Sequence, residues 1–390
     1  MNVLIDARVL SRGGISGIEE YTRFMIQNLL ESDKKNHYEF FYSGIRRHPF
    51  PEEWKRPNTS IIEVNLPNKA LEVSMRLFGV PRAETKDTGV IFSPHFNYLP
   101  APKTAKRIIT FHDLSFVHFL ELYPLRKRIW HWQQQYQKQA ECADALIAVS
   151  EFTRKDIINT FKVPETKVHT IHSGVNPFYK RLERTDASIT RLTSRDKRVA
   201  KPFLLFVGTI EPRKNISGII KAFENLKNDP FHRELRLIIA GKRGWLCDTI
   251  FKDAANAKWS KDIIFWGEAS HEELRALYNL AEGFVYPSFF EGFGFPPLEA
   301  QSCGTPVITS NRSSLPEIVG NSALLVDPWK ISEIADAMNL VLKNEAVRNM
   351  LIARGTENVK RFTWGRASRS LLDIINSLES HATARTAKEY

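Results

Sequence analysis

The chain carries the nonapeptide Glu291-Gly292-Phe293-Gly294-Phe295-Pro296-Pro297-Leu298-Glu299 between two short apolar segments. Its two prolines indicate the start of a helix, because proline fits the first helical turn, where its missing N–H has no intrahelical partner. Gly304 is placed to end that helix before the next apolar segment begins. The pattern therefore predicts strand, loop, helix and strand, with Glu291 on the loop and Glu299 on the helix.

Both glutamates can then face one pocket at the end of the first strand. Backbone N–H groups of the loop and the helix N-terminus would lie in the same pocket and favour an anion there. A ligand with several hydroxyl groups and one anionic group suits such a pocket. For either glutamate taken alone, a solvated helix start is the competing interpretation, since acidic residues are favoured in the first helical turn.

Short apolar segments alternate with amphipathic helical patterns along the whole chain, which is typical of an α/β fold with parallel sheets. The 390 residues exceed the roughly 250–300 that one core usually holds. We expect two Rossmann-like domains, residues 1–180 and 202–365, and ligands of such pairs bind in the cleft between them. A basic exposed segment, 181–201, would follow the first domain. Strands are expected at 3–5, 39–42, 61–64, 90–92, 107–111, 145–149, 168–171, 203–207, 235–240, 263–266, 284–286, 307–309 and 323–326.

The composition is that of an ordinary globular protein, with 43% hydrophobic and 25% charged residues. No apolar run reaches the roughly 18 residues of a membrane-spanning helix, and the N-terminus lacks the pattern of a signal peptide. The three cysteines, Cys142, Cys247 and Cys303, share no metal-ligand spacing and are typical of small buried residues in a reducing compartment. We therefore expect a cytoplasmic protein.

Part of the net charge of +11 is concentrated in residues 101–132, where six basic side chains stand against two acidic ones and alternate with aromatic residues. Such a segment suits an anionic membrane surface or a phosphorylated acceptor. A solvated helix with its aromatic residues in the core is the equal alternative. Nucleic acid is not an expected partner, because no recognised motif is present and the charge is spread over both halves of the chain.

Two further motifs stand where predicted strands of the first domain end. The segment Arg12-Gly13-Gly14-Ile15-Ser16-Gly17-Ile18 follows the first strand, and its glycines permit close backbone approach to a phosphate or a sugar. A plain glycine turn is the alternative, because the full dinucleotide fingerprint is missing. His112 follows the strand at 107–111, where it can hydrogen-bond a sugar hydroxyl or transfer a proton.

The first strand of the second domain leads into Gly208-Thr209-Ile210-Glu211-Pro212-Arg213-Lys214-Asn215. Arg213 and Lys214 stand just before a predicted helix, and two cations with the dipole of that helix form a diphosphate site. A metal ion is the other way to neutralise a diphosphate, but the chain has no Asp-x-Asp pair and no obvious His/Asp cluster. The two cations would then stabilise the departing phosphate themselves.

Together these segments resemble the retaining glycosyltransferases of family 4, whose fold is GT-B. The eight-residue spacing of Glu291 and Glu299 and the phosphate segment at 208–215 are specific in combination. The resemblance covers nearly the whole chain except 45–88 and 181–201. Supporting features follow in the expected order: the glycine-rich first loop, His112-Asp113, Ala148-Val149-Ser150-Glu151-Phe152, His172-Ser173-Gly174-Val175 and Phe362-Thr363-Trp364.

The resemblance implies roles for residues of the second domain. Glu299 would bind the ribose hydroxyls of a nucleotide, and Glu291 would bind donor-sugar hydroxyls beside the backbone amides of Phe293, Gly294 and Phe295. Lys214, with Arg213, would hold the diphosphate. Many family members have an arginine where this chain has Thr209, which leaves open whether Arg213 binds phosphate directly. Lys242 and the loop at Gly267 would lie near the base.

The resemblance also implies roles in the first domain. His112 would contact the donor sugar near its C6 group, and Gly14, with Gly17 in the same loop, would approach the β-phosphate. A C-terminal helix at about 366–380 would cross back onto the first domain.

The implied reaction moves a hexosyl group from a nucleoside-diphosphate sugar to an acceptor hydroxyl with retention of the anomeric configuration. The family favours a same-face route, in which the leaving phosphate accepts the acceptor's proton and neither glutamate is a nucleophile. No cofactor and no metal are expected beyond this co-substrate.

The motifs look most like mannosyltransferases of bacterial O-antigen and other surface polysaccharides, which favours GDP-mannose over a UDP-hexose. The acceptor would be a saccharide or a polyprenyl-diphosphate-linked saccharide, reached at the inner face of the plasma membrane. A UDP-sugar-dependent enzyme of another pathway, a GT-B nucleotide-sugar epimerase and a phosphorylase are the alternatives.

Overall fold

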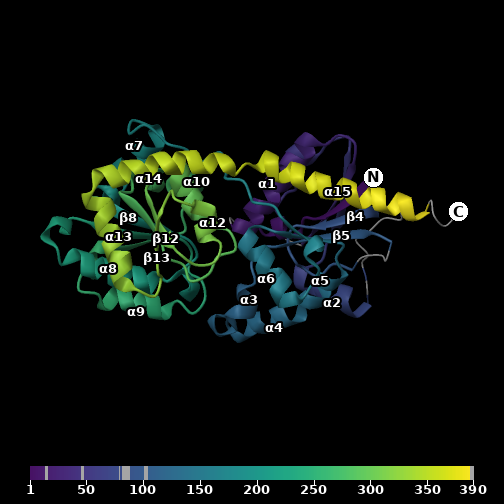
Figure 1. Cartoon of the computed structure of the whole chain (residues 1–390), viewed down its shortest axis with the longest axis horizontal. Coiled ribbons are helices and arrows are strands. Elements are labelled where there is room, and N and C mark those ends of the chain that lie inside the picture. The colour runs from purple at the N-terminus through teal and green to yellow at the C-terminus, as the bar shows by residue number, and fades with distance from the viewer. Residues whose placement is uncertain (14–15, 45–47, 79, 81–87, 101–103, 387–390) are drawn as a thin grey trace. The chain divides into compact units, whose positions relative to one another are not determined.

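The computed structural model describes residues 1–13, 16–44, 48–78, 80, 88–100 and 104–386 (Figure 1). The chain divides into two compact units. Unit 1 comprises Met1–Leu114, Ile129–Gly174 and Thr363–Tyr390, and unit 2 comprises Ser115–Arg128 and Val175–Phe362.

Unit 1 is built on a seven-stranded parallel sheet with the order β3-β2-β1-β4-β5-β6-β7. The sequence order reverses between β1 and β4, and the carboxyl ends of such neighbours form a topological switch point, where ligands of α/β sheets bind. The strands are β1 Asn2–Asp6, β2 His37–Ser43, β3 Thr59–Val64, β4 Thr88–Ser93, β5 Lys106–Phe111, β6 Ala145–Ala148 and β7 Val168–Thr170.

Unit 2 repeats this plan with a six-stranded parallel sheet in the order β10-β9-β8-β11-β12-β13, which reverses between β8 and β11. Every strand expected from the sequence is present, with its ends shifted by two residues or fewer. The strands are β8 Phe203–Val207, β9 Arg236–Ala240, β10 Ile263–Gly267, β11 Gly283–Tyr286, β12 Val307–Ser310 and β13 Leu324–Val326.

Helices connect most of the strands, as is usual for parallel pairing. Two of them, α1 and α10, begin with a capping box, in which serine and glutamate satisfy the first free N–H groups reciprocally. The helices are α1 Gly17–Ser32, α2 Asn68–Phe78, α3 Ser115–His118, α4 Leu125–Gln133, α5 Tyr136–Cys142, α6 Glu151–Phe161, α7 Ala187–Arg195, α8 Ile216–Lys227, α9 Asp248–Asn256, α10 His271–Leu280, α11 Phe295–Ser302, α12 Leu315–Val319, α13 Ile331–Lys343, α14 Glu345–Asn358 and α15 Trp364–Thr386, with the 3₁₀ turns η3 Leu120–Leu122, η6 Pro212–Lys214 and η7 Pro230–His232.

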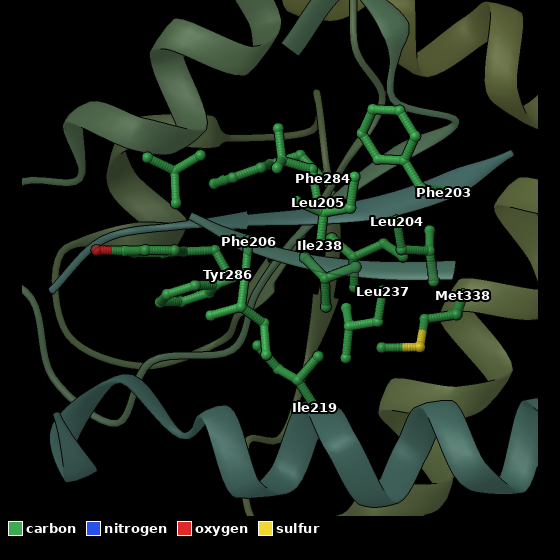
Figure 2. Close-up of a cluster of buried hydrophobic side chains, with 14 of the residues drawn as sticks. Phe203, Leu204, Leu205, Phe206, Ile219, Leu237, Ile238, Phe284, Tyr286 and Met338 are labelled. Carbon is green, nitrogen blue, oxygen red and sulfur yellow. The ribbon is translucent and has the colours of Figure 1, made fainter. Parts of the chain in front are cut away.

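The core of unit 2 shows why these segments form strands. All five residues of β8 are buried, because helices cover both faces of a parallel sheet and leave no polar side. Figure 2 shows the packing around it, with Ile219 of α8 and Met338 of α13 against side chains of β8, β9 and β11. This packing fixes the strand ends, where the functional loops begin.

The C-terminal helix α15 belongs to unit 1, as expected. Its residues Ala367, Leu371 and Ile375 are buried, and the ring of Trp364 stacks on Phe24 of α1 with 5.6 Å between ring centroids. This confirms the predicted return of the chain to its first domain.

The segment 181–201 contains a helix that the sequence analysis did not predict. Asp186 caps α7 through a hydrogen bond to Ser188 N, and Ile189 and Leu192 are buried in the core of unit 2. Only two apolar residues, three apart, dock this helix, while Arg191 and Arg195 stay exposed. The segment was expected to be exposed throughout because these two positions are hidden in a basic, polar stretch.

No helix among the described residues has the length and apolar character needed to cross a membrane.

Candidate functional site

The candidate site lies at the switch point of unit 2, where the loops after β8 and β11 meet. The Arg213 carbonyl accepts hydrogen bonds from Phe289 N at 2.9 Å and from Ser288 Oγ at 3.1 Å. Asn215, in the left-handed conformation at φ 56°, donates its side-chain amide to the Pro287 carbonyl at 3.2 Å. The two loops therefore form one framework at the sheet edge.

A cluster of four charged side chains occupies this framework. Lys214 Nζ lies 2.5 Å from Glu291 Oε1, and Arg213 NH1 lies 3.1 Å from Glu291 Oε2. Arg213 also pairs with Glu211 at 2.8 Å. All four residues are largely buried, so the two cations and the two carboxylates compensate one another away from bulk water.

The cluster fixes the charge state of Glu291. Burial by itself would raise the pKa of this carboxyl, but the nearby Arg213 and Lys214 outweigh that effect and lower the pKa to about 2. Burial and the neighbouring Arg213 lower the pKa of the Lys214 ammonium, whereas Glu291 acts in the opposite direction. Glu291 is therefore a carboxylate at any physiological pH.

Two hydroxyl groups complete the surroundings of Glu291. Its Oε1 accepts hydrogen bonds from Ser288 Oγ at 2.6 Å and from Tyr286 OH at 3.0 Å, and Lys214 Nζ donates to the Tyr286 oxygen at 2.6 Å. Burial and the charge of Glu291 raise the pKa of Tyr286, so its phenol stays protonated and donates. Sequence reasoning missed both hydroxyls, although they stand three and five residues before the glutamate.

Glu299 has a separate tyrosine partner. It lies on α11, largely buried, and its Oε2 accepts a hydrogen bond from Tyr278 OH of α10 at 2.8 Å. Burial and the charge of Glu299 raise the pKa of Tyr278. Each glutamate of the nonapeptide is thus held by one buried tyrosine hydroxyl, and Tyr278 was also missed because it stands 21 residues away.

The loop between the two glutamates is held in one shape. Gly294 adopts φ +118°, and a Cβ atom at this position would lie 2.9 Å from Leu315 Cδ2, so only glycine fits there. Ser314 Oγ donates to the carbonyls of Glu291 and Phe293, both at 2.9 Å. The ring of Phe295 lies against that of Phe293, with 5.1 Å between centroids.

Three further predicted residues lie on neighbouring loops at the same sheet edge. Thr209 follows β8 and is partly buried. Lys242 follows β9 with an exposed side chain, and its carbonyl accepts a hydrogen bond from Ile210 N at 2.9 Å. Gly267 ends β10 at φ +91°, and its carbonyl accepts Gly241 N at 2.8 Å. Their contacts with a base stay a prediction.

In unit 1, His112 follows β5, as expected. Its Nε2 lies 2.8 Å from the Pro94 carbonyl, and the ring meets Tyr21 edge-on at 4.7 Å between centroids. Burial lowers the pKa of His112 to about 4, so the imidazole is neutral near pH 7. With Nε2–H donating to Pro94, Nδ1 is an acceptor suited to a hydroxyl group.

The structure describes part of the glycine-rich loop. Gly17 is the first residue of α1, directly after the capping residue Ser16. Gly14 lies outside the described residues, so its predicted approach to a phosphate stays a prediction.

Within the described ranges, no three His, Cys, Asp or Glu side chains gather in a way that could hold a metal ion. Arg213 and Lys214 are the cations of the charged cluster at this sheet edge.

Comparison with known proteins matches both halves of the chain to family models. The model for Glycosyltransferase Family 4 matches residues 16–177, and the model for Glycosyl transferases group 1 matches residues 192–358. The second match contains the charged cluster and both glutamates of the nonapeptide.

The O-antigen chain mannosyltransferase B of Escherichia coli is 34% identical over 277 residues, which make up 70% of this chain and 71% of that protein. The serotype-specific mannosyltransferase WbdA, also of Escherichia coli, is 32% identical over 240 residues, 61% of this chain and 29% of that longer protein. Among solved structures, sucrose-phosphate synthase from Thermosynechococcus elongatus matches with a TM-score of 0.73 at 18% identity, covering 97% of this chain and 99% of that one.

Proposed function

The chain belongs to the family 4 glycosyltransferases of the GT-B fold, and on this premise we propose that it transfers mannose from GDP-mannose to a saccharide acceptor in surface-polysaccharide assembly. Its relation to O-antigen mannosyltransferases supports the sugar and the pathway class. The saccharide acceptor is proposed to be free or linked to a polyprenyl diphosphate, with the enzyme in the cytoplasm at the inner membrane face.

The observation that carries this proposal is the cluster of Arg213, Lys214 and Glu291 at the switch point between β8 and β11. In the free protein, Glu291 pairs with both cations, and Glu211 supplies the second negative charge. A diphosphate would take over the cations, because it brings more negative charge and several acceptor oxygens. Glu291 would then be free to bind hydroxyl groups of the donor sugar.

The other proposed donor contacts follow from the same geometry. Glu299, which accepts a hydrogen bond from Tyr278, would bind the ribose hydroxyls through its carboxylate. The N-terminus of α11 would add its dipole to the stabilisation of the leaving diphosphate. The neutral imidazole of His112 would accept a sugar hydroxyl.

Retention without a protein nucleophile is the proposed course. When the cations turn to the diphosphate, Tyr286 and Ser288 would still donate to Glu291 Oε1, and the rest of the carboxylate would bind sugar hydroxyls instead of the anomeric carbon. In the proposed step, the bond between C1 and the diphosphate oxygen breaks, the acceptor oxygen bonds to C1 on the same face, and the leaving diphosphate takes the acceptor's proton.

A thermal-shift experiment with GDP, UDP, ADP and their sugars tests the donor, with and without EDTA. We expect selective stabilisation by GDP and GDP-mannose that survives EDTA, because the two side-chain cations replace a metal ion. Selective stabilisation by UDP would instead identify a UDP-sugar-dependent enzyme. Loss of the shift in EDTA would show that a metal is required, and no shift with any nucleotide would contradict the proposal.

Incubation with GDP-mannose alone, followed by NMR, tests the course of the reaction. Slow hydrolysis by a retaining enzyme releases α-mannose first. Release of the β-anomer would contradict retention, and a new epimer of the nucleotide sugar would identify an epimerase. Covalent trapping of sugar on Glu291 or Glu299 would contradict the route without a protein nucleophile.

A further inference from the structure

Helix α4 differs from an ordinary surface helix because its apolar face is exposed. None of its nine residues is fully buried. Leu125, Ile129 and Trp132, spaced at i, i+4 and i+7, share one helix face, and 71%, 47% and 81% of their surfaces are exposed. A helix of a globular protein normally turns such an apolar face toward the core.

The opposite face of α4 carries the polar and amphipathic side chains, and these have partners in the protein. Lys127 Nζ lies 3.1 Å from the centre of the Trp245 ring, and Trp130 Nε1 donates to Glu72 of α2 at 3.3 Å. His131 forms a hydrogen bond with Tyr136. These contacts hold α4 in an orientation that leaves its apolar face exposed.

Basic residues flank the exposed apolar face. On a helical wheel, Arg128 lies on one side of the three apolar residues and Arg126 on the other, and both are exposed. Arg128 donates to the Tyr123 carbonyl at 2.8 Å, and within the described part of the chain neither arginine forms an ion pair. Val117 and Leu120, just before α4, add further exposed apolar surface.

We propose that this face of α4, Leu125, Ile129 and Trp132 with Arg126 and Arg128, binds the surface of an anionic lipid bilayer. Apolar side chains enter the boundary between headgroups and acyl chains, while flanking arginines pair with anionic headgroups. Tryptophan is enriched at this boundary, which fits the most exposed residue of the face. The inference rests on the proposed function, because a lipid-linked acceptor is what would bring the enzyme to a membrane.

The size of the face favours lipid over a second protein. Leu125 and Trp132 are seven positions apart on the helix, which is about 10 Å at 1.5 Å per residue. A specific protein interface usually buries more than about 1,000 Å², which a stripe of three side chains cannot supply. A bilayer needs no matching surface and accepts a short apolar stripe with a basic rim.

Flotation with vesicles of phosphatidylcholine containing phosphatidylglycerol tests the proposal, with pure phosphatidylcholine vesicles as reference. We expect the full chain to float with the anionic vesicles at low salt. Combined replacement Leu125→Gln, Ile129→Gln and Trp132→Gln should lower the vesicle-bound to free ratio at least tenfold, because the apolar contact is lost. Arg126→Gln should lower it about fivefold, the contribution of one basic residue near an anionic surface.

Phe231→Gln is the matched control, because Phe231 of η7 is 66% exposed and lies outside α4. It should leave flotation unchanged. Trp132→Phe keeps the apolar character, so it should float normally while quenching of tryptophan fluorescence by brominated lipid decreases. Stabilisation of each variant by GDP shows that it is folded and tests the proposed function separately.

Several outcomes would overturn the proposal. Absence of flotation at low salt would do so, and so would equal flotation of the triple variant and the wild type. If sedimentation shows a dimer that the triple variant converts to a monomer, the face is a protein interface. A chain that responds to GDP but does not float would lose this inference and keep its proposed donor site.

Discussion

At the carboxyl end of β1, Arg8 pairs with Asp6, two residues earlier in the chain, whereas at the carboxyl end of β8, Lys214 pairs with Glu291, 77 residues later. The two strands hold equivalent places, each beside the neighbour at which the strand order reverses. Both ends carry buried cations and carboxylates, so the difference lies in where the partners come from.

Arg8 and Asp6 bind each other through two pairs of atoms. Arg8 NH2 lies 2.6 Å from Asp6 Oδ2, Nε lies 2.8 Å from Oδ1, and both side chains are 3% exposed. Arg8 NH2 also donates to the Tyr98 carbonyl at 3.0 Å. Such a two-pronged pair between near neighbours in the chain uses both carboxylate oxygens of Asp6, which indicates a role in supporting the fold.

The cluster of unit 2 joins two loops, and a ligand can separate them. Glu291 comes from the loop after β11, while Arg213 and Lys214 come from the loop after β8. In the proposed function, an anion that binds the cations would displace the carboxylate without breaking a strand or a helix. The same sheet position therefore holds a local charge pair in one unit and, in the other, a pair shared between loops, for which we propose ligand binding.

The largest expected effect is that of Asp6→Asn on stability. The substitution leaves the guanidinium of Arg8 buried without a counter-charge, which costs about 3–5 kcal/mol. Denaturant titration should show this loss, while stabilisation by GDP persists because unit 2 is untouched. Asp336→Asn, at an exposed position of α13, is the control and should change stability little. A loss below about 1 kcal/mol would mean that the pair is not structural.

The next effect is that of Lys214→Met on the reaction. We expect the rate of GDP release from GDP-mannose to fall about 10²–10³-fold, as when one stabilising donor of a transition state is removed. Lys221→Met, on the exposed side of α8, provides a matched control and should keep the wild-type rate. Nearly full activity of the Lys214→Met enzyme would mean that Lys214 is a structural cation like Arg8. The charged residues at the two strand ends would then not differ in role.

Structural features formed by residues close together in the sequence could be predicted, whereas contacts between distant residues could not. The strand Phe203–Val207 is a continuous apolar run, and the cations after it stand in one short segment, so both were predicted. Family likeness placed this loop and Glu291 in one donor site, but the ion pairs between them were not predicted. The hydrogen bonds of Tyr286 and Tyr278 were missed, because they depend on how a strand end and a separate helix face the glutamates.

Orientation was the second limit. The spacing of Leu125, Ile129 and Trp132 is that of a buried helix face, and the sequence alone left core and membrane as equal alternatives for this segment. Only the contacts of Lys127 and Trp130 show that the other face points inward. In α7, by contrast, two apolar residues suffice to dock a helix that the basic composition concealed.

The third effect compares the two tyrosines. Tyr286→Phe and Tyr278→Phe each remove one hydrogen bond to a carboxylate and keep the ring, which should cost about tenfold in activity. Tyr278→Phe should raise KM for the donor, because Glu299 is proposed to bind ribose in the ground state. Tyr286→Phe should lower kcat instead, because Glu291 is proposed to act on the reacting sugar.

This split separates positioning from structural roles. Two tyrosines that only fill space would affect KM and kcat alike in both variants, and each variant would lose stability rather than a single kinetic parameter. Phe206→Leu, which alters the ring stacked on Tyr286 at 5.7 Å, is the control for packing. It should lower stability without reproducing either kinetic pattern.

The smallest expected effect is also the most direct test of a displaceable carboxylate. Glu291→Gln keeps the shape of the side chain but removes the charge that competes with a diphosphate for Arg213 and Lys214. GDP should therefore bind about fivefold more tightly to this variant, a gain of roughly 1 kcal/mol for releasing one partly screened pair. Titration calorimetry measures it. Weaker binding of GDP would mean that Glu291 supports the diphosphate site instead of occupying it, and the cluster would then resemble the Arg8–Asp6 pair of unit 1.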